Sequence, residues 1–436
     1  MNRCAGIGAL VVAALLSLSA PVYAAGDRYP HATMMGSLAV QPDSDATLTG
    51  VQVFLRGGLD REGSAHNGLA ALTAEVVART PVTVAGTSRP LRDAIWSLGA
   101  NLTTTVEPQD VRFYVEGRPD AAIPALGMLA AALAAPDFSN ATLAAAKSAL
   151  RARISDLDQS PFGVVATMLR GAYYPGSSAG MSPAGSAAIV AGASPADVRA
   201  FWEKNYRRGG ATLAAAGRID PPVATAAQAI LQRLPAGEVA QVDLRAKALT
   251  DPPARIVTHR DVAIPLLGLG FAAPPAGTKD FAPMLVVQAI IAALGRESSI
   301  TTPPPSLRSI NVVYQYTVTP ANFIIYANGD AADAAAGARE VFAVTELLAT
   351  KPLEDAIVRR YRTLAVGNFV GDAMTLEDRA GLVGSFALRG LDPDYPNAIL
   401  DALSKVTPAD IERVAKNYLA KYAVAIILPR AESKQR

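Results

Sequence analysis

The segment HNGLAALTAEVVART, residues 66–80, has the pattern of a buried helix. Large aliphatic side chains recur at the spacing of one helix face, at Leu69, Leu72 and Val76. The neighbouring stripe carries only small side chains, at Ala71, Ala74 and Ala78. The sequence therefore predicts a helix that belongs to a core and whose second stripe offers no reactive group.

The first 24 residues have the features of a secretory signal. Arg3 precedes an apolar run over residues 5–20, and small residues stand before the expected cleavage point after Ala24. A membrane anchor is disfavoured because the run is short and Pro21 follows it at once. We expect a periplasmic protein. Its single cysteine, Cys4, leaves with the signal, so the exported chain has neither a disulfide nor a thiolate metal site.

The composition excludes some classes of function. The chain has 40 basic and 38 acidic residues, which gives no basic footprint for nucleic acid. Half of its 436 residues are hydrophobic, which is enough for two cores of ordinary size. Beyond the signal, no segment is long and apolar enough to cross a bilayer.

Two sequence matches indicate an internal duplication. VRFYVEGRPDAAI (111–123) recurs as FIIYANGDAADAAA (323–336), and SPADVRAFWEKNY (194–206) recurs as TPADIERVAKNY (407–418). Both pairs have nearly the same separation along the chain, so they support one tandem repeat. In the second pair, a serine or threonine followed by proline is typical of a helix start, since the hydroxyl caps the helix and proline suits the first turn.

The duplication predicts two homologous domains, 25–235 and 256–436, joined by a linker at 236–255. Each half has the order strand, helices, strand pair, helices, strand, which indicates an α+β fold. We expect a mixed or antiparallel sheet in each half, with helices packed on one face. The strands are expected at 48–58, 100–117 and 211–218 in the first half and at 263–274, 311–329 and 423–430 in the second.

The ordered series of motifs resembles a known peptidase family. GLAxLxxxVV at 68–77, WSLGANLTTTVEPQDVRFY at 96–114, PDF at 136–138 and the segment 194–206 are together similar to the insulinase/pitrilysin family of zinc metallopeptidases. The resemblance covers nearly the whole exported chain. By length it is closest to the processing-peptidase branch, in which two protomers pair around an enclosed chamber.

The resemblance implies a metal motif that this chain lacks. The family binds zinc through H-x-x-E-H on a helix, where the glutamate activates the metal-bound water. Aligned on that frame, Ala71 and Glu75 replace the two histidines and Ala74 replaces the glutamate. The glutamate that is the third ligand aligns with Ala152. We therefore expect no catalytic residue, no metal and no bound cofactor in this chain.

Two other catalytic arrangements are weaker. His66 and Glu75 are nine residues apart and point to opposite faces of a helix, so they cannot share an ion. The motif GSSAG, with Ser178 at its centre, matches a nucleophile elbow, but prolines flank it where a strand and a helix are required. Only His259 follows it as a possible base, so we interpret this segment as a loop.

The second half carries the substrate-binding residues that the resemblance implies. In the family, the protomer without zinc can supply an arginine and a tyrosine that hold the substrate against the partner's metal. Here Tyr314 aligns with that tyrosine, while Arg308 is displaced by one residue, and Pro303 to Pro305 interrupt an expected helix. A strand tyrosine and a surface cation are the alternative roles of these two residues.

Two functions remain open from the sequence. The first is a non-catalytic protomer that pairs with a zinc-bearing homologue carrying H-x-x-E-H and helps it to bind peptide or unfolded protein. The second is a stand-alone peptide-binding or scaffold protein, and an enzyme with an unrecognised site ranks last. A neighbouring reading frame with H-x-x-E-H would favour the first.

We predict that the purified exported chain holds no stoichiometric zinc and cleaves no peptide by itself. The reason is that alanine stands at three of the four positions that the metal chemistry requires. Elemental analysis checks this prediction. One tightly held zinc per chain, lost on Glu75→Ala, would contradict it.

Overall fold

The computed structural model describes residues 29–177, 180–240, 242, 255–293, 307–318, 321–329 and 334–430. The expected signal at 1–24, most of the expected linker at 236–255 and Ser178 lie outside these residues. The domain boundaries expected from the sequence stay a prediction.

The N-terminal half contains a six-stranded sheet, a small hairpin and eight α-helices within the described residues. The strands are β1 (Thr33–Met35), β2 (Leu38–Pro42), β3 (Thr49–Leu55), β4 (Pro81–Val84), β5 (Thr87–Pro90), β6 (Ala100–Val106), β7 (Val111–Gly117) and β8 (Ala211–Gly217). The helices are α1 (Leu69–Arg79), α2 (Leu91–Ser97), α3 (Pro119–Ala134), α4 (Asn140–Gln159), α5 (Pro161–Tyr173), α6 (Ala187–Gly192), α7 (Pro195–Asn205) and α8 (Pro221–Arg233).

The C-terminal half contains a five-stranded sheet and six α-helices within the described residues. The strands are β9 (Arg255–Arg260), β10 (Leu266–Ala272), β11 (Leu307–Gln315), β12 (Asn322–Gly329) and β13 (Ala423–Pro429). The helices are α9 (Phe281–Ala293), α10 (Ala334–Thr350), α11 (Asp355–Gly371), α12 (Leu376–Leu388), α13 (Tyr395–Leu403) and α14 (Pro408–Tyr418).

The two sheets have the same strand order. The first runs β2-β8-β3-β7-β6, with β1 added at its edge, and the second runs β9-β13-β10-β12-β11. β2 pairs in parallel with β8, and β9 pairs in parallel with β13, while the other neighbours in each sheet pair antiparallel. This correspondence confirms the α+β fold with two homologous halves and mixed sheets.

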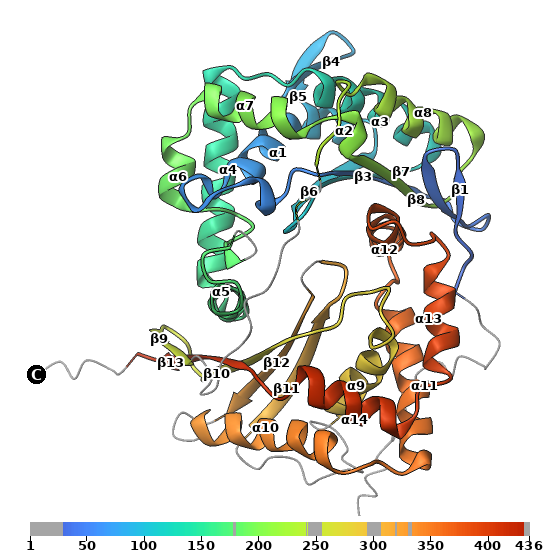
Figure 1. Ribbon diagram of the computed structural model, residues 1–436. Coiled ribbons are helices and arrows are strands. Elements are labelled where there is room, and N and C mark those ends of the chain that lie inside the picture. The colour runs from blue at the N-terminus through green and yellow to red at the C-terminus, as the bar shows by residue number, and fades with distance from the viewer. Residues whose placement is uncertain are drawn as a thin grey trace, which may run out of the picture.

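Each sheet is covered on both faces, and the second face is covered by the other half. Helices α1, α3 and α8 pack on one face of the first sheet, and α12 from the C-terminal half packs on β2, β3 and β8 from the opposite side. Conversely, α5 from the N-terminal half packs on β10 and β13 of the second sheet. Figure 1 shows α12 beneath the upper sheet and α5 above the lower one. The sequence had led us to expect helices on one face only.

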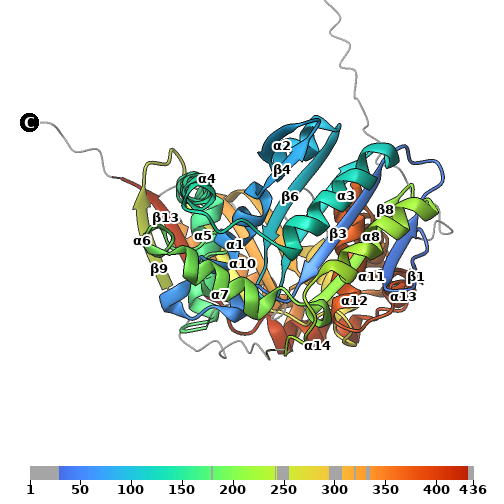
Figure 2. The same ribbon diagram turned by 90° about the horizontal axis from the view of Figure 1, so that it is seen from above.

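The two halves thus enclose separate cores and share three smaller ones. Figure 2 shows α3, α7 and α8 lying over the outer face of the first sheet, away from the C-terminal half. On the inner side, Phe54 and Ala214 of the first sheet pack with Val383 of α12. Val165 and Leu169 of α5 pack with the second sheet in the same way. Apolar burial at both contacts stabilises the arrangement of the halves.

A glycine permits close approach at each of these two contacts. A Cβ atom at Gly384 of α12 would lie 2.1 Å from a ring carbon of Phe54. A Cβ atom at Gly268 of β10 would lie 2.3 Å from a methyl group of Val165. Both distances are far below van der Waals contact, so neither position has room for a larger residue.

Several helices begin at capping residues that are recognisable in the sequence. Ser194 caps α7 and Thr407 caps α14, each in a capping box with the aspartate three residues later. Proline occupies the first turn of both helices, as the sequence predicted. Among the described residues, no helix combines the length and the apolar character needed to span a membrane.

We predict that Gly384→Ala lowers the stability of the protein. A glycine inside a helix usually costs up to about 1 kcal/mol relative to alanine, so a gain would be expected from helix propensity alone. Here the clash with Phe54 should outweigh that gain, because overpacking a core costs roughly 1–3 kcal/mol. Thermal unfolding of the purified protein measures the net effect.

Gly367→Ala is the matched control, because Gly367 also lies inside a helix and an added Cβ would meet no atom within 4 Å. It should leave the melting temperature unchanged or raise it. An equal rise in both variants would show that α12 does not pack against Phe54 as described.

Candidate functional site

The stripe of α1 that corresponds to the metal-binding face of the resembled family is packed into the core. Ala71 is 3% exposed and Ala74 is 1% exposed. Both belong to the N-terminal core together with Leu72 and Val76. Their methyl groups present neither a metal ligand nor a general base. Larger polar side chains at these positions would have to displace packed neighbours.

Glu75, the one carboxylate left on this frame, is already paired. Arg92 of α2 donates to both of its oxygens, at 3.2 Å each. Arg79, one turn further along α1, lies 3.4 Å away, and the Thr104 hydroxyl lies 3.4 Å from the same carboxylate. The two guanidinium groups offset its charge in a side chain that is only 11% exposed. Glu75 therefore has a structural role that does not involve a metal.

The carboxylate of Glu62 caps the N-terminus of α1. The Glu62 side chain accepts hydrogen bonds from the backbone N–H groups of Gly68 and Ala70 and from the amide of Asn67. It thus caps the free N–H groups that begin the helix. Burial raises the pKa of Glu62 to about 6, and these hydrogen bonds oppose the rise. The helix is held rigidly although its metal-binding residues are absent.

The remaining residues of the metal motif do not assemble a site. Ala152 lies on an exposed side of α4, and His66 is exposed in the short turn before α1. Within the described residues, no group of three or more histidine, cysteine, aspartate or glutamate side chains is placed to hold a metal ion. The residues present do not fit the zinc of the resembled family.

Tyr314 and Arg308 both lie in β11. Tyr314 is 6% exposed and its hydroxyl donates to the backbone oxygen of Pro274. Its ring packs against Phe281 and Phe323, and burial raises the pKa of its hydroxyl well above the usual value. The side chain of Arg308 lies outside what the structure describes. The substrate-binding role of both residues stays a prediction.

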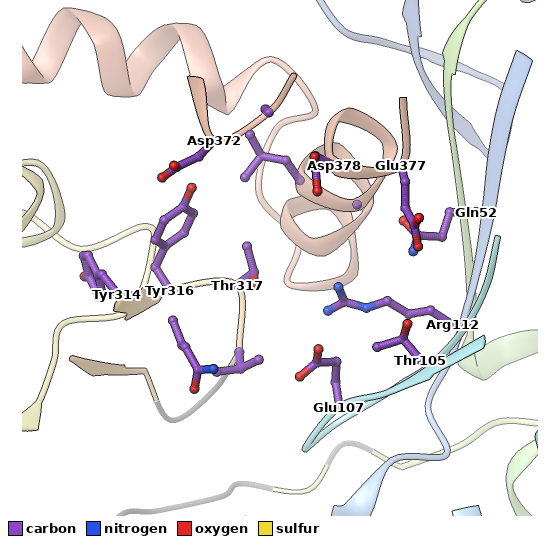
Figure 3. Close-up of a pocket in the computed structure, with 15 residues that line it drawn as sticks. Gln52, Thr105, Glu107, Arg112, Tyr314, Tyr316, Thr317, Asp372, Glu377 and Asp378 are labelled. Carbon is purple, nitrogen blue, oxygen red and sulfur yellow. The ribbon is translucent and has the colours of Figure 1, made fainter. Parts of the chain in front are cut away.

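A cavity of about 350 Å³ lies between the two halves. The first sheet contributes Gln52, Thr105 and Arg112, and the C-terminal half contributes Tyr314 and Tyr316 with the end of α11 and the start of α12. Figure 3 shows the carboxylates of Asp372, which follows α11, and of Glu377 and Asp378 in the first turn of α12, on the side of the cavity away from Glu107.

The sheet separates this cavity from Glu75. Side chains alternate between the two faces of a strand, and Thr104 of β6 reaches the Glu75 carboxylate on the outer face. Its neighbours point inward: Thr103 donates to Glu377 at 3.1 Å, and Thr105 lines the cavity. The cavity is therefore distinct from the position at which the resembled family binds zinc.

No motif in the sequence predicts this cavity. Its one local signal is a polar residue in each of two otherwise apolar strands, Gln52 in TGVQVFL and Arg112 in VRFYVEG. The acidic wall comes from a segment more than 250 residues away along the chain. No spacing rule connects these segments, because the contact depends on how the halves pack.

We predict that Glu75→Ala lowers the free energy of unfolding by about 1–3 kcal/mol, because it leaves Arg92 without its carboxylate partner. Chemical denaturation of the purified protein measures the change. Asp120→Asn serves as the control, since Asp120 pairs with Arg118 in an exposed contact where both side chains are more than 70% exposed. Similar small effects in both variants would contradict the structural role of Glu75.

Comparisons with known proteins agree with the fold. Residues 192–364 match the family model described as the peptidase M16 inactive domain. The comparison with curated proteins gave no match.

Solved structures match almost the whole chain. A peptidase M16 inactive domain from Pseudomonas fluorescens is 17% identical, with a TM-score of 0.74, and the match covers 91% of this chain and 97% of that one. A protease from Helicobacter pylori is 15% identical, with a TM-score of 0.77 and coverage of 92% and 100%. A chain of complex III2 from Candida albicans is 15% identical, with a TM-score of 0.71 and coverage of 92% and 96%.

At these identities the solved structures establish the fold, and the family model matches residues 192–364. The resemblance to the insulinase/pitrilysin peptidases is thereby confirmed: the chain has the M16 peptidase fold, and its residues 192–364 match the inactive domain of that family.

Proposed function

We propose that this chain is the non-catalytic protomer of a periplasmic zinc metallopeptidase of the insulinase type. It pairs with a homologue that carries H-x-x-E-H and zinc, completes the chamber around the substrate and helps to bind peptide. The catalytic chemistry belongs to the partner, and no step of it is assigned to residues of this chain.

The observation that carries this proposal is the state of α1. The helix is kept in position by the Glu62 cap and by the ion pairs of Glu75, yet its metal-binding stripe is alanine. A chain that lacks the metal-binding side chains but retains the surrounding helices and sheet is consistent with a non-catalytic subunit. The description of the matched family model as an inactive domain supports the same role.

Pairing is supported by analogy with one structural neighbour. The Candida albicans chain with this fold comes from a multi-subunit assembly, complex III2. Fold alone does not determine function, so the partner and its zinc remain part of the proposal. A stand-alone peptide-binding protein is the alternative, and it predicts a monomer with no metal-bearing homologue.

We predict that the tagged protein, expressed from its own promoter, is found in the periplasm, cleaved after Ala24 and bound to a zinc-containing homologue. The interface should bury more than roughly 1,000 Å², the minimum for a specific complex. Because the charges are nearly balanced, added salt should weaken the complex little.

Size-exclusion chromatography of native periplasmic extract, with elemental analysis of each peak, tests this pairing. Zinc should co-elute with the complex and be absent from the isolated chain. A single monomeric species in the extract would favour the stand-alone alternative.

We further propose that Tyr314 and Arg308 help to hold the substrate in the assembled pair. The ring of Tyr314 lines the cavity between the halves, and its hydroxyl would have to exchange its bond to Pro274 for one to the substrate. Tyr314→Phe is expected to lower kcat/KM of the reconstituted pair by at least about tenfold, while pairing is unchanged. Arg308→Ala should have a smaller effect.

Tyr326→Phe is the control for this test, because Tyr326 is a strand tyrosine that packs against Phe162 of α5 instead. Melting temperatures of all variants separate lost activity from lost stability, since removing the bond to Pro274 alone should cost about 1 kcal/mol. Full activity of the Tyr314→Phe pair would leave Tyr314 with a structural role only.

A further inference from the structure

Two buried polar atoms in the cavity between the halves have no hydrogen-bond partner among the described residues. They are the amide oxygen Oε1 of Gln52 and the guanidinium nitrogen Nη2 of Arg112. Gln52 is 3% exposed and Arg112 is 9% exposed. Both side chains line the cavity, and Figure 3 shows the Arg112 guanidinium projecting into the open space.

The surrounding residues fix these atoms in place. Asp110 accepts a hydrogen bond from Nε of Arg112 at 2.6 Å, and the guanidinium lies 5.1 Å from the centre of the Phe54 ring. These contacts fix the orientation of the Arg112 side chain, and its Nη2 atom remains unpaired at the cavity. At the other atom, Gly381 of α12 has no side chain, and a Cβ there would lie 3.3 Å from Oε1 of Gln52. A side chain at position 381 would therefore crowd the buried amide oxygen.

Leaving such atoms unpaired is costly. A buried donor or acceptor without a partner loses about 1–3 kcal/mol relative to one that is satisfied. An apolar residue of similar shape at position 52 would avoid the cost altogether. Polar atoms that are held in place and left unpaired are expected where an external ligand supplies the missing partners.

The carboxylates around the cavity define the charge of that ligand. Glu107, Asp372, Glu377 and Asp378 line it, whereas Arg112 is its one lining cation within the described residues and is itself paired with Asp110. Asp372 makes no ion pair in the part of the chain that the structure describes. Burial raises the pKa of Glu107 and of Asp372, so the negative charge of the cavity comes first from Glu377 and Asp378. A cationic ligand would offset that charge.

We propose that this cavity is a binding site for a basic amino acid, whose ammonium or guanidinium group donates to Gln52 and to the acidic wall. Its carbonyl or carboxylate oxygen accepts from Nη2 of Arg112. The same chemistry is present in a free amino acid and in a basic residue of a peptide. A volume of about 350 Å³ is at the lower end of the range for small-molecule sites, which suits a ligand of this size.

An organic cation fits the site better than a metal ion. The described residues contain no group of three or more side chains placed to hold a metal. Gln52 and Arg112 also call for a ligand that both donates and accepts hydrogen bonds.

Calorimetric titration of the purified protein with L-arginine and with L-citrulline tests the proposal. The two ligands have nearly the same shape, and only arginine carries the side-chain charge. We expect arginine to bind on the order of tenfold more tightly, since a hydrogen bond to a charged group contributes roughly 1.5–3 kcal/mol. L-Lysine should bind as well, and Nα-acetyl-L-argininamide distinguishes a peptide residue from a free amino acid.

Gln52→Met and Asp372→Asn are the test variants. Gln52→Met should weaken arginine binding by about tenfold, while the melting temperature without ligand stays the same or rises, because an unpaired buried acceptor is removed. Asp372→Asn removes a carboxylate charge that has no ion pair among the described residues, so it should fold normally and bind arginine several-fold more weakly. Asp120→Asn, on the exposed surface, should have no effect on binding.

Equal binding of arginine and citrulline, or no binding of either, would overturn the proposal. Unchanged arginine affinity in both test variants would do the same, as would binding of calcium ions in preference to arginine. These measurements use the isolated chain and do not depend on the proposed pairing, so the failure of one proposal leaves the other intact.

Discussion

The need to cover both faces of two mixed sheets is the constraint on which the rest of this structure depends. The outer face of each sheet is covered by helices of its own half, and the inner face is covered by one helix from the other half, α12 or α5. Gly384 and Gly268 allow these helices to approach closely. Because neither half covers its own inner face, apolar burial holds the halves together. The cavity between them is formed by the same packing.

The position of helix α1 does not depend on metal-binding side chains. Its position depends on packing, on the Glu62 cap and on the pairing of Glu75 with Arg92 and Arg79. None of these interactions requires a metal. At the positions that bind zinc in the resembled family, alanine therefore does not disturb the helix. The carboxylate of Glu75 forms ion pairs with Arg92 and Arg79. On the other face of the sheet, Gln52 and Arg112 line a polar cavity together with the carboxylates at the start of α12.

The local and repeated features of the fold were predictable. The capping boxes at Ser194 and Thr407, the strand pairs and the duplication follow from patterns of a few residues. Five strands were not expected, namely β1, β2, β4, β5 and β9. Two of them, β2 and β9, each pair in parallel with the last strand of their half. Short segments such as LAVQP and RIVTHR carry no strong alternation or turn signal. Their partners lie far along the chain, so no local pattern indicates the pairing.

The sequence by itself determined that the motif positions Ala71 and Ala74 cannot serve a metal, since no fold gives a methyl group a ligand atom. It also determined the two-part α+β architecture, because hydrophobic period and helix caps are local properties. Only the tertiary structure decided that Glu75 is paired with arginine, that the hydroxyl of Tyr314 bonds to Pro274 and that two polar atoms of the first sheet face the carboxylates of α12. The first two depend on contacts between segments that lie apart within one half, and the third forms only when both halves pack against each other.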